Sequence, residues 1–413
     1  MKHSAVNGPS PGGPIHGPLT GLRVLEVGTL LAGPMTARIL GELGAEVIKI
    51  EPPDQPDILR VWGPQLPKGR GLLWRVNSRN KKCITLNLRQ PRGQELFRQL
   101  AAKADVLVEN FRPGTLEKWG LGWPQLQALN RNLVLARVSG YGQTGPYAAR
   151  AGFASVGEAM GGIRHINGFP DQPPPRLGVS LGDTLAAMFA SQGVLAALLA
   201  IRDHDCGGQI VDASIMEACF AMLEGTVTEY DRLGLVKGPS GTGLKGVAPS
   251  NLYRSRDDKW MVIAANADGV FIRLCAAMGT PELAEDPRFV DHTVRGENDS
   301  AIDAIVGAWA ARHTAQQIDD ILNAAGVVCG PVYTIADIMD DPQFKAREMI
   351  VTMSDPHLGE FAAPGIVPKL SATPGTVRWA GPPEPGFHND EVYRDVLKLD
   401  AKAIAALRDE HII

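Results

Sequence analysis

Short β-rich runs alternate with amphipathic helical patterns over the first 140 residues, and this alternation limits the possible folds more than any other feature. The strand-like runs are residues 22–27, 45–50, 105–110 and 133–138. The helical patterns between them are residues 34–43, 93–104 and 123–129. Strands joined through helices pair in parallel with right-handed crossovers. We therefore predict an α/β fold whose first domain is a Rossmann-like, open parallel sheet with helices on both faces.

The remainder of the chain has a different pattern. Residues 183–201 and 215–233 predict long helices, and the glycine-rich stretch 237–246 predicts a domain boundary, after which strands and helices predict a smaller α+β domain. The apolar run 184–201 approaches the length of a membrane span, but we expect a buried core helix because the run includes Ser191. The predicted divisions are a flexible arm at 1–20, a large domain at 21–236, a small domain at 237–329 and a C-terminal segment at 330–413.

Charge and cysteine usage argue against several function classes. The chain has 41 Lys and Arg against 45 Asp and Glu, so it lacks the basic excess of a nucleic-acid or membrane-surface binder. Its 5 cysteines show neither a CxxC pair nor a Cys/His ligand spacing, so we expect no metal site and no disulfide framework. The glycine- and proline-rich start has no apolar signal-peptide segment, and together with the cysteine usage this predicts a cytoplasmic protein.

Polar and basic side chains gather where predicted strands end. The stretch 77–89 carries four cations, residues 109–114 follow one strand directly, and the glycine loop 139–146 follows another. Open α/β sheets bind ligands at the carboxyl ends of their strands, and basic groups there suit a phosphate-bearing ligand. A solvated surface would explain any one stretch alone. The turn between Gly28 and Gly33 lacks the GxGxxG spacing, so a packing turn explains it better than dinucleotide binding.

Asp183 is the candidate nucleophile. Gly182 allows a tight turn, and Asp183 begins a long apolar helix, where its carboxylate meets unpaired backbone N–H groups and the positive end of the helix dipole. Such a residue is either a helix N-cap or an anionic nucleophile that attacks an activated acyl group. Its spacing alone does not choose between the two.

Several segments together resemble the class III CoA-transferase family, also called the CaiB/BaiF type. The matching segments are Gly21–Val27 with Ala32–Pro34, Gly44–Glu51, Asn80–Lys82, Val108–Gly114, Ser139–Pro146, Gly182–Asp183 and Asp341–Arg347. They cover nearly the whole chain in the family's order. The resemblance implies an enzyme that moves coenzyme A between carboxylic acids. It also implies an interlocked homodimer in which residues 330–413 rejoin the first domain.

The resemblance also implies the site and its chemistry. Asp183 matches the catalytic aspartate, which attacks an acyl-CoA thioester to give an aspartyl mixed anhydride and then an aspartyl-CoA thioester. Coenzyme A and acyl-CoA are expected as substrates, with no permanently bound cofactor. The implied CoA contacts are Leu86, Asn87, Arg89, Asn110, Phe111, Arg112, Lys118 and Arg150.

Departures from the family pattern narrow the range of expected substrates and reactions. Leu31 stands where formyl-CoA transferases have a catalytic glutamine, and Pro52 stands where they have an arginine, so oxalate chemistry is not expected. Residues 152–154 lack the histidine of the racemase branch. The stretches 150–162 and 175–183 look most like the branch that uses succinyl-CoA with malate, citramalate, itaconate or mesaconate.

Some roles stay open at this level. A dicarboxylate needs a cation for its far carboxylate, and the sequence does not choose among Arg60, Arg70 and Arg75. For Glu158 and His165, a packed or solvent-facing role is favoured over a role in the site. Three alternatives to transfer between two acids also remain. They are intramolecular CoA migration of the mesaconyl-CoA C1–C4 type, racemisation of a 2-methylacyl-CoA, and non-catalytic acyl-CoA binding.

Overall fold

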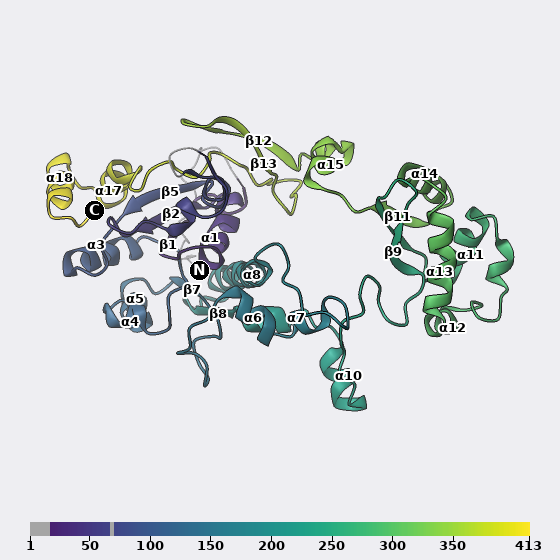
Figure 1. The fold of residues 1–413 in the computed structure, drawn as a ribbon. Helices are drawn as coiled ribbons and strands as arrows, with labels where there is room; N and C mark the ends of the chain where they lie inside the picture. The colour runs from purple at the N-terminus through teal and green to yellow at the C-terminus, as the bar shows by residue number, and fades with distance from the viewer. Residues whose placement is uncertain (1–16, 67–69) are drawn as a thin grey trace. The chain divides into compact units, whose positions relative to one another are not determined.

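The computed structural model describes residues 17–66 and 70–413, and Figure 1 shows its fold. The predicted arm at 1–20 lies outside the described residues except for 17–20. The chain divides into two compact units. Among the described residues, unit 1 comprises 17–163, 177–224 and 346–413, and unit 2 comprises 164–176 and 225–345.

Six parallel strands form the central sheet of unit 1, in the order β5-β2-β1-β6-β7-β8. The strands are β1 (Arg23–Glu26), β2 (Glu46–Glu51), β5 (Lys81–Thr85), β6 (Val106–Glu109), β7 (Val134–Ser139) and β8 (Ile210–Ser214). The chain first moves outward from β1 to β2 and β5 and then returns to the other side of β1 as β6, so the order reverses between β1 and β6. The predicted α/β fold with an open parallel sheet is confirmed.

Side chains on the two faces of this sheet build two cores, because successive residues of a strand point to opposite faces. Val24 of β1 belongs to the core beneath α1 (Ala32–Glu42) and α8 (Leu181–His204). Its neighbour Leu25 belongs to the core beneath α3 (Pro91–Ala101). The remaining short elements of unit 1 are η1 (Ile58–Val61), β3 (Gln65–Leu66), β4 (Arg70–Gly71), α2 (Leu72–Asn77), α4 (Thr115–Lys118), α5 (Trp123–Leu129), α6 (Ala154–Met160) and α9 (Ile215–Phe220).

Helix α8 is long and apolar enough, by length and composition, to cross a membrane. In unit 1 it lies against α1, β7 and β8. Its buried residues Ala186, Ala190, Val194 and Ala197 recur at helical spacing and belong to the apolar cores of that unit. One face of the helix therefore packs into the core of unit 1, as a core helix would, whereas Met188, Phe189 and Leu199 on it are exposed.

Residues 346–413 return to unit 1 and cover its edge strand β5. They form the hairpin of β12 (Ile350–Asp355) and β13 (Gly359–Pro364), then α17 (Asn389–Leu397) and α18 (Ala401–Asp409). Hydrogen bonds satisfy the outward-facing backbone of β5. The His388 N–H donates to Cys83 O (2.9 Å), and its Nδ1 accepts the Cys83 N–H (3.0 Å). The buried Tyr393 hydroxyl donates to Thr85 O (2.7 Å). This edge is therefore closed to pairing with another strand.

Unit 2 is built on a three-stranded antiparallel sheet in the order β11-β10-β9. Its strands are β9 (Ser250–Arg254), β10 (Trp260–Ala264) and β11 (Val328–Pro331). Its helices are α10 (Thr226–Leu233), α11 (Asp268–Ala277), η2 (Pro281–Ala284), α12 (His292–Glu297), α13 (Asp299–Ala310), α14 (Ala315–Ala324) and α15 (Ile335–Asp340), while α7 (Ile163–Ile166) and α16 (Pro342–Ala346) span its limits. Met261 and Ile263 on one face of β10 pack with Phe271 and Trp309 in its own apolar core. The predicted smaller α+β domain is confirmed.

The limits of the units differ from the predicted ones. Unit 2 includes residues 164–176, which the sequence places in the large domain, and its main segment runs from 225 to 345, where the sequence predicts 237 and 329. The continuous helix predicted at 215–233 is wrong. It is two helices, α9 and α10, because Glu224 adopts a φ of +52° and Gly225, a weak helix former, follows it.

Candidate active site

Asp183 lies in the first turn of α8 and lines a cavity of about 150 Å³. The cavity also takes residues from the loop after β1, from the ends of β6 and β7, and from the start of α9. Its walls include Thr29, Trp62, Asn110, Ser139, Phe153 and Ile215. The N-cap of α8 is Ser180, so the interpretation of Asp183 as the cap is wrong. The carboxylate is therefore placed to meet a ligand in this cavity.

The loop after β1 is clamped by Asn110, which directly follows β6. Asn110 Oδ1 accepts the Thr29 N–H (2.8 Å), and its Nδ2 donates to Thr29 O (2.9 Å). A Cβ at Gly28 would lie 2.8 Å from Asn110 Oδ1, and a Cβ at Gly33 would lie 3.1 Å from Asn110 Cγ. Both glycines are therefore needed for the amide to reach the loop. This clamp lies where the strand order reverses, the usual ligand position in open α/β sheets.

A fully buried ion network supports the same loop. Lys49 Nζ lies 2.8 Å from Glu26 Oε1 and 2.7 Å from Asp57 Oδ2, and it donates to the Gly28 carbonyl (2.5 Å). Asp57 Oδ1 accepts the N–H of Leu30 (3.1 Å), which has a left-handed φ of +63°. Burial by itself would lower the pKa of Lys49, but the carboxylates of Glu26 and Asp57 outweigh it and raise that pKa. The network thus offsets the cost of about 1–2 kcal/mol of the left-handed Leu30.

A second carboxylate lies beside the start of α8. Glu158 on α6 is 2% exposed, and its Oε1 accepts the Gly182 N–H (3.0 Å). The buried thiol of Cys219 responds to both acids. Burial first, and then the charges of Glu158 and Asp183, raise the pKa of Cys219 to about 11. Sequence reasoning gave Glu158 a packed or solvent-facing role, and the structure buries it next to the candidate nucleophile.

A larger cavity, of about 250 Å³, lies at the carboxyl ends of β1, β2, β5 and β6. Thr29 lines both cavities, so the two adjoin. Ile412 O accepts the Asn87 N–H (2.8 Å), which ties the wall of this cavity to the C-terminal segment. Four of the predicted CoA contacts line it, namely Leu86, Asn87, Arg89 and Phe111.

The other predicted contacts lie elsewhere. Asn110 lines the cavity of Asp183. Arg112 and Lys118 are exposed and are absent from the walls of both cavities. Arg150 stacks on Tyr147, with its guanidinium carbon 3.6 Å from the ring centroid. The structure thus brings part of the predicted set to two adjoining cavities and leaves three basic residues outside them.

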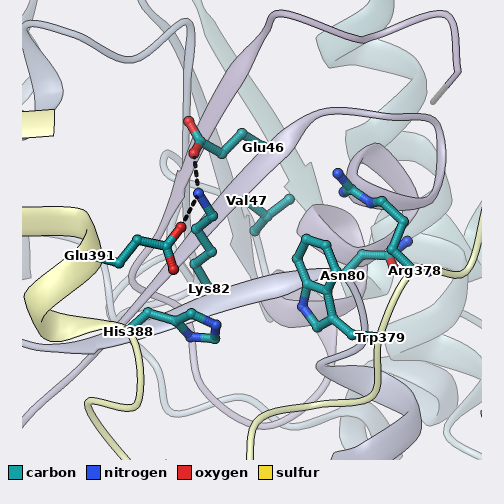
Figure 2. A pocket seen from close by; sticks show the side chains of 8 residues that line it. All are labelled: Glu46, Val47, Asn80, Lys82, Arg378, Trp379, His388 and Glu391. Atoms are coloured by element: carbon teal, nitrogen blue, oxygen red, sulfur yellow. Dashed lines mark hydrogen bonds and ion pairs between the residues drawn. The ribbon is translucent and has the colours of Figure 1, made fainter. Parts of the chain in front are cut away.

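A third cavity, of about 420 Å³, lies between the amino ends of β2 and β5 and the C-terminal segment, and Figure 2 shows its walls. Lys82 Nζ lies 2.8 Å from Glu46 Oε1 and 2.8 Å from Glu391 Oε1, as the dashed lines mark. Arg378 lies over the Trp379 ring, 4.6 Å from its centroid. The single charge of Lys82 is thus neutralised by carboxylates within the fold. This cavity is at the strand ends opposite those that surround Asp183.

Two of the three candidates for the far carboxylate of a dicarboxylate, Arg60 and Arg75, are not at the site. Arg60 Nη2 lies 2.6 Å from Glu51 Oε2, and Arg75 Nε lies 3.1 Å from Asp355 Oδ2. Both arginines are buried, and neither lines the Asp183 cavity. The side chain of Arg70 lies outside what the structure describes.

Comparison with known families decides where these features belong. The sequence model of CoA-transferase family III matches residues 19–389 of this chain. The chain belongs to CoA-transferase family III. The predicted resemblance is confirmed, and the protein is an enzyme of the CoA-transferase type, whose substrates are CoA thioesters.

Relatives match this family III chain over nearly its full length. It is 50% identical over 396 residues to a succinyl-CoA–D-citramalate CoA-transferase of Chloroflexus aurantiacus, which covers 96% of this chain and 98% of the relative. It is 41% identical over 398 residues to a succinyl-CoA–L-malate CoA-transferase alpha subunit of Chloroflexus aurantiacus, with 96% and 92% covered. The solved structure of a CaiB/BaiF family protein from Brucella suis matches with a TM-score of 0.81 and 31% identity, covering 92% of this chain and 100% of that one.

We predict that Gly182→Ala lowers the kcat of this CoA-transferase about 10- to 100-fold. A Cβ at Gly182 would lie 2.8 Å from Ile215 Cγ2 and 3.0 Å from Glu158 Cγ, so either these two side chains or the first turn of α8 with Asp183 must shift, and each of them borders the site. Steady-state kinetics measure the loss. Gly178→Ala is the control, because a Cβ there meets no atom within 4 Å. Equal kcat values for the two variants would contradict the prediction.

Proposed function

We propose that this family III enzyme moves CoA from succinyl-CoA to a small dicarboxylic acid, with Asp183 as the covalent carboxylate. The observation that carries the proposal is the position of Asp183. Its side chain lines a small cavity that adjoins, at Thr29, a larger one lined by four of the residues implied for CoA. The names of the two relatives, which pair succinyl-CoA with citramalate and with malate, support the choice of acids.

Coenzyme and acyl group occupy different cavities in this proposal. The nucleotide end of CoA lies in the cavity of about 250 Å³, beside Phe111 and residues 86–89. The pantetheine arm passes the clamp of Thr29 and Asn110 and brings the thioester to Asp183. The cavity of about 150 Å³ takes the acyl chain and admits only a small acid.

The chemistry needs one carboxylate in two roles. An oxygen of Asp183 attacks the thioester carbonyl carbon, the C–S bond breaks, and CoA leaves as a thiolate with the electron pair. The thiolate sulfur then attacks the Asp183 carbonyl carbon of the resulting anhydride, its C–O bond breaks, and succinate leaves as a carboxylate. The acceptor acid reverses both steps. Neither water nor a net proton is consumed, so the energy of the thioester is kept.

Incubation with succinyl-CoA and single dicarboxylic acids tests the proposal. We expect new thioesters, identified by mass, with citramalate, malate, itaconate or mesaconate. Double-reciprocal plots of the initial rate against succinyl-CoA, at several fixed concentrations of the acid, should give parallel lines. The reason is that the covalent enzyme is formed in one half-reaction and consumed in the other. The absence of any new thioester would contradict the proposed acid class. CoA migration within one acid without an acceptor would favour the intramolecular alternative, and deuterium uptake from heavy water would favour racemisation.

We predict that Arg89→Gln raises the KM for succinyl-CoA about tenfold and leaves kcat nearly unchanged. Arg89 is an exposed residue in the wall of the larger cavity, where its guanidinium can pair with a CoA phosphate. The control is Arg92→Gln, which removes an exposed charge on α3 outside that cavity. The same KM for both variants would count against Arg89 as a CoA contact.

We also propose a homodimer. Helix α10 buries none of its residues, and Val227, Tyr230 and Leu233 on it are 51%, 61% and 75% exposed. Exposed apolar surface of this kind marks an interaction site, and a second copy of the chain would cover it. Light scattering is expected to give twice the chain mass of 44.2 kDa, and a monomer mass would refute the proposal.

A further inference from the structure

Glu158 is a buried carboxylate that the transfer scheme does not use. Its side chain is 2% exposed, and its Oε1 accepts the Gly182 N–H at 3.0 Å. The ion pairs found within 17–66 and 70–413 include none that involves Glu158. A buried carboxylate normally has a cationic partner. The absence of one here calls for a functional explanation.

Glu158 contacts the turn of α8 that carries Asp183. Gly182, whose N–H binds Glu158, precedes Asp183 by one peptide unit. Burial first, and then the charges of Glu158 and Asp183, raise the pKa of the Cys219 thiol, so this thiol lies within the field of both acids. Glu158 and Cys219 are buried and Asp183 is partly exposed, so water and salt screen the interaction between the two charges only in part.

We propose that Glu158 is a positioning residue whose negative charge drives Asp183 toward its covalent forms, an inference that rests on the transfer function proposed above. The unacylated, ionised carboxylate of Asp183 is repelled by Glu158. In the anhydride and in the thioester Asp183 is neutral, because its charge has left with the CoA thiolate or with succinate. The repulsion therefore raises the free energy of the resting enzyme relative to both intermediates. The hydrogen bond to Gly182 holds the two acids at a fixed separation.

Two variants separate the charge from the hydrogen bond. Glu158→Gln keeps an oxygen that can accept the Gly182 N–H but removes the charge. Glu158→Asp keeps the charge but withdraws the acceptor by one methylene. We expect Glu158→Gln to lower kcat on the order of tenfold, with the KM for succinyl-CoA changed less than about twofold. Glu158→Asp should retain more kcat than Glu158→Gln. A structural role through the hydrogen bond alone predicts the reverse order.

The covalent forms give a second readout. The protein is mixed with succinyl-CoA in the absence of an acceptor acid, and the reaction is quenched with acid. Mass spectrometry of the intact protein then gives the fraction of chains that carry a succinyl or a CoA group. We expect this fraction to be lower for Glu158→Gln than for the wild type, at equal thermal midpoints. Equal fractions, or a greater loss of kcat for Glu158→Asp than for Glu158→Gln, would overturn the inference alone. A wild-type chain that never carries an adduct would overturn the proposed function as well.

Discussion

Asp183→Asn is expected to abolish CoA transfer, with turnover at least about 10⁴-fold below the wild-type rate. The amide lacks the anionic oxygen that attacks the thioester, so neither the anhydride nor the aspartyl thioester can form. Asn is close in size to Asp, and Ser180 rather than Asp183 occupies the cap position of α8, so the helix should remain intact. Thioester exchange between succinyl-CoA and an acceptor acid, followed by mass, measures the loss.

A measurement of substrate binding and a control variant distinguish the loss of chemistry from a loss of substrate affinity or of folding. The Kd for succinyl-CoA of the Asp183→Asn protein should stay within about threefold of the wild type, because the larger cavity is untouched. Asp203→Asn is the matched control, because Asp203 is an exposed carboxylate in the last turn of the same helix, paired with Arg202. Turnover of the Asp183 variant at the rate of this control would refute the covalent role.

Lys49→Met is expected to lower the free energy of unfolding of unit 1 by about 3–5 kcal/mol. Lys49, Glu26 and Asp57 are all nearly inaccessible to solvent. Removal of the ammonium therefore leaves two buried carboxylates without the positive charge of Lys49 that offsets their loss of hydration. The Leu30 N–H depends on Asp57, so the loop that lines the Asp183 cavity should also loosen and kcat should fall. Urea unfolding followed by circular dichroism measures the first effect, and steady-state kinetics the second.

Lys103→Met is the control for this substitution. Lys103 is exposed in the turn after α3 and takes part in no buried ion pair of the described chain. Its replacement should change the free energy of unfolding by less than about 0.5 kcal/mol. If both variants unfold at the same urea concentration as the wild type, the network contributes nothing to stability.

The sequence predicts regular elements well where one periodicity runs long enough. Strands β1, β2, β6 and β7 and helices α3 and α8 lie where the patterns place them, because each strand is buried and each helix has one packed face. Short elements were missed, among them α2, since six residues hold less than two turns of pattern. The break at Glu224 was also missed, because a positive φ at a glutamate has no signal in hydrophobic periodicity.

The site was predictable only in part. The resemblance assigns Asp183 as the nucleophile, whereas its spacing also allows a helix cap. Trp62 and Phe153 line its cavity but were not predicted, because both are exposed residues in irregular segments that tertiary structure brings to the site. The arginines at 60 and 75 failed as candidates for a different reason. Arg60 pairs with Glu51 on strand β2, and Arg75 pairs with Asp355 in the C-terminal segment of the chain. Sequence spacing could not reveal either ion pair.

The closure of β5 by residues 346–413 has a consequence for biosynthesis. Strand β5 leaves the ribosome early, but the groups that satisfy its outer backbone follow only after the whole of unit 2 has been translated. A nascent chain that has reached residue 345 can already complete unit 2, while the larger unit still presents an open strand edge. Such edges favour aggregation and pairing with the wrong chain. Unit 1, which carries Asp183, is therefore expected to mature last and to be the more exposed to mispairing during translation.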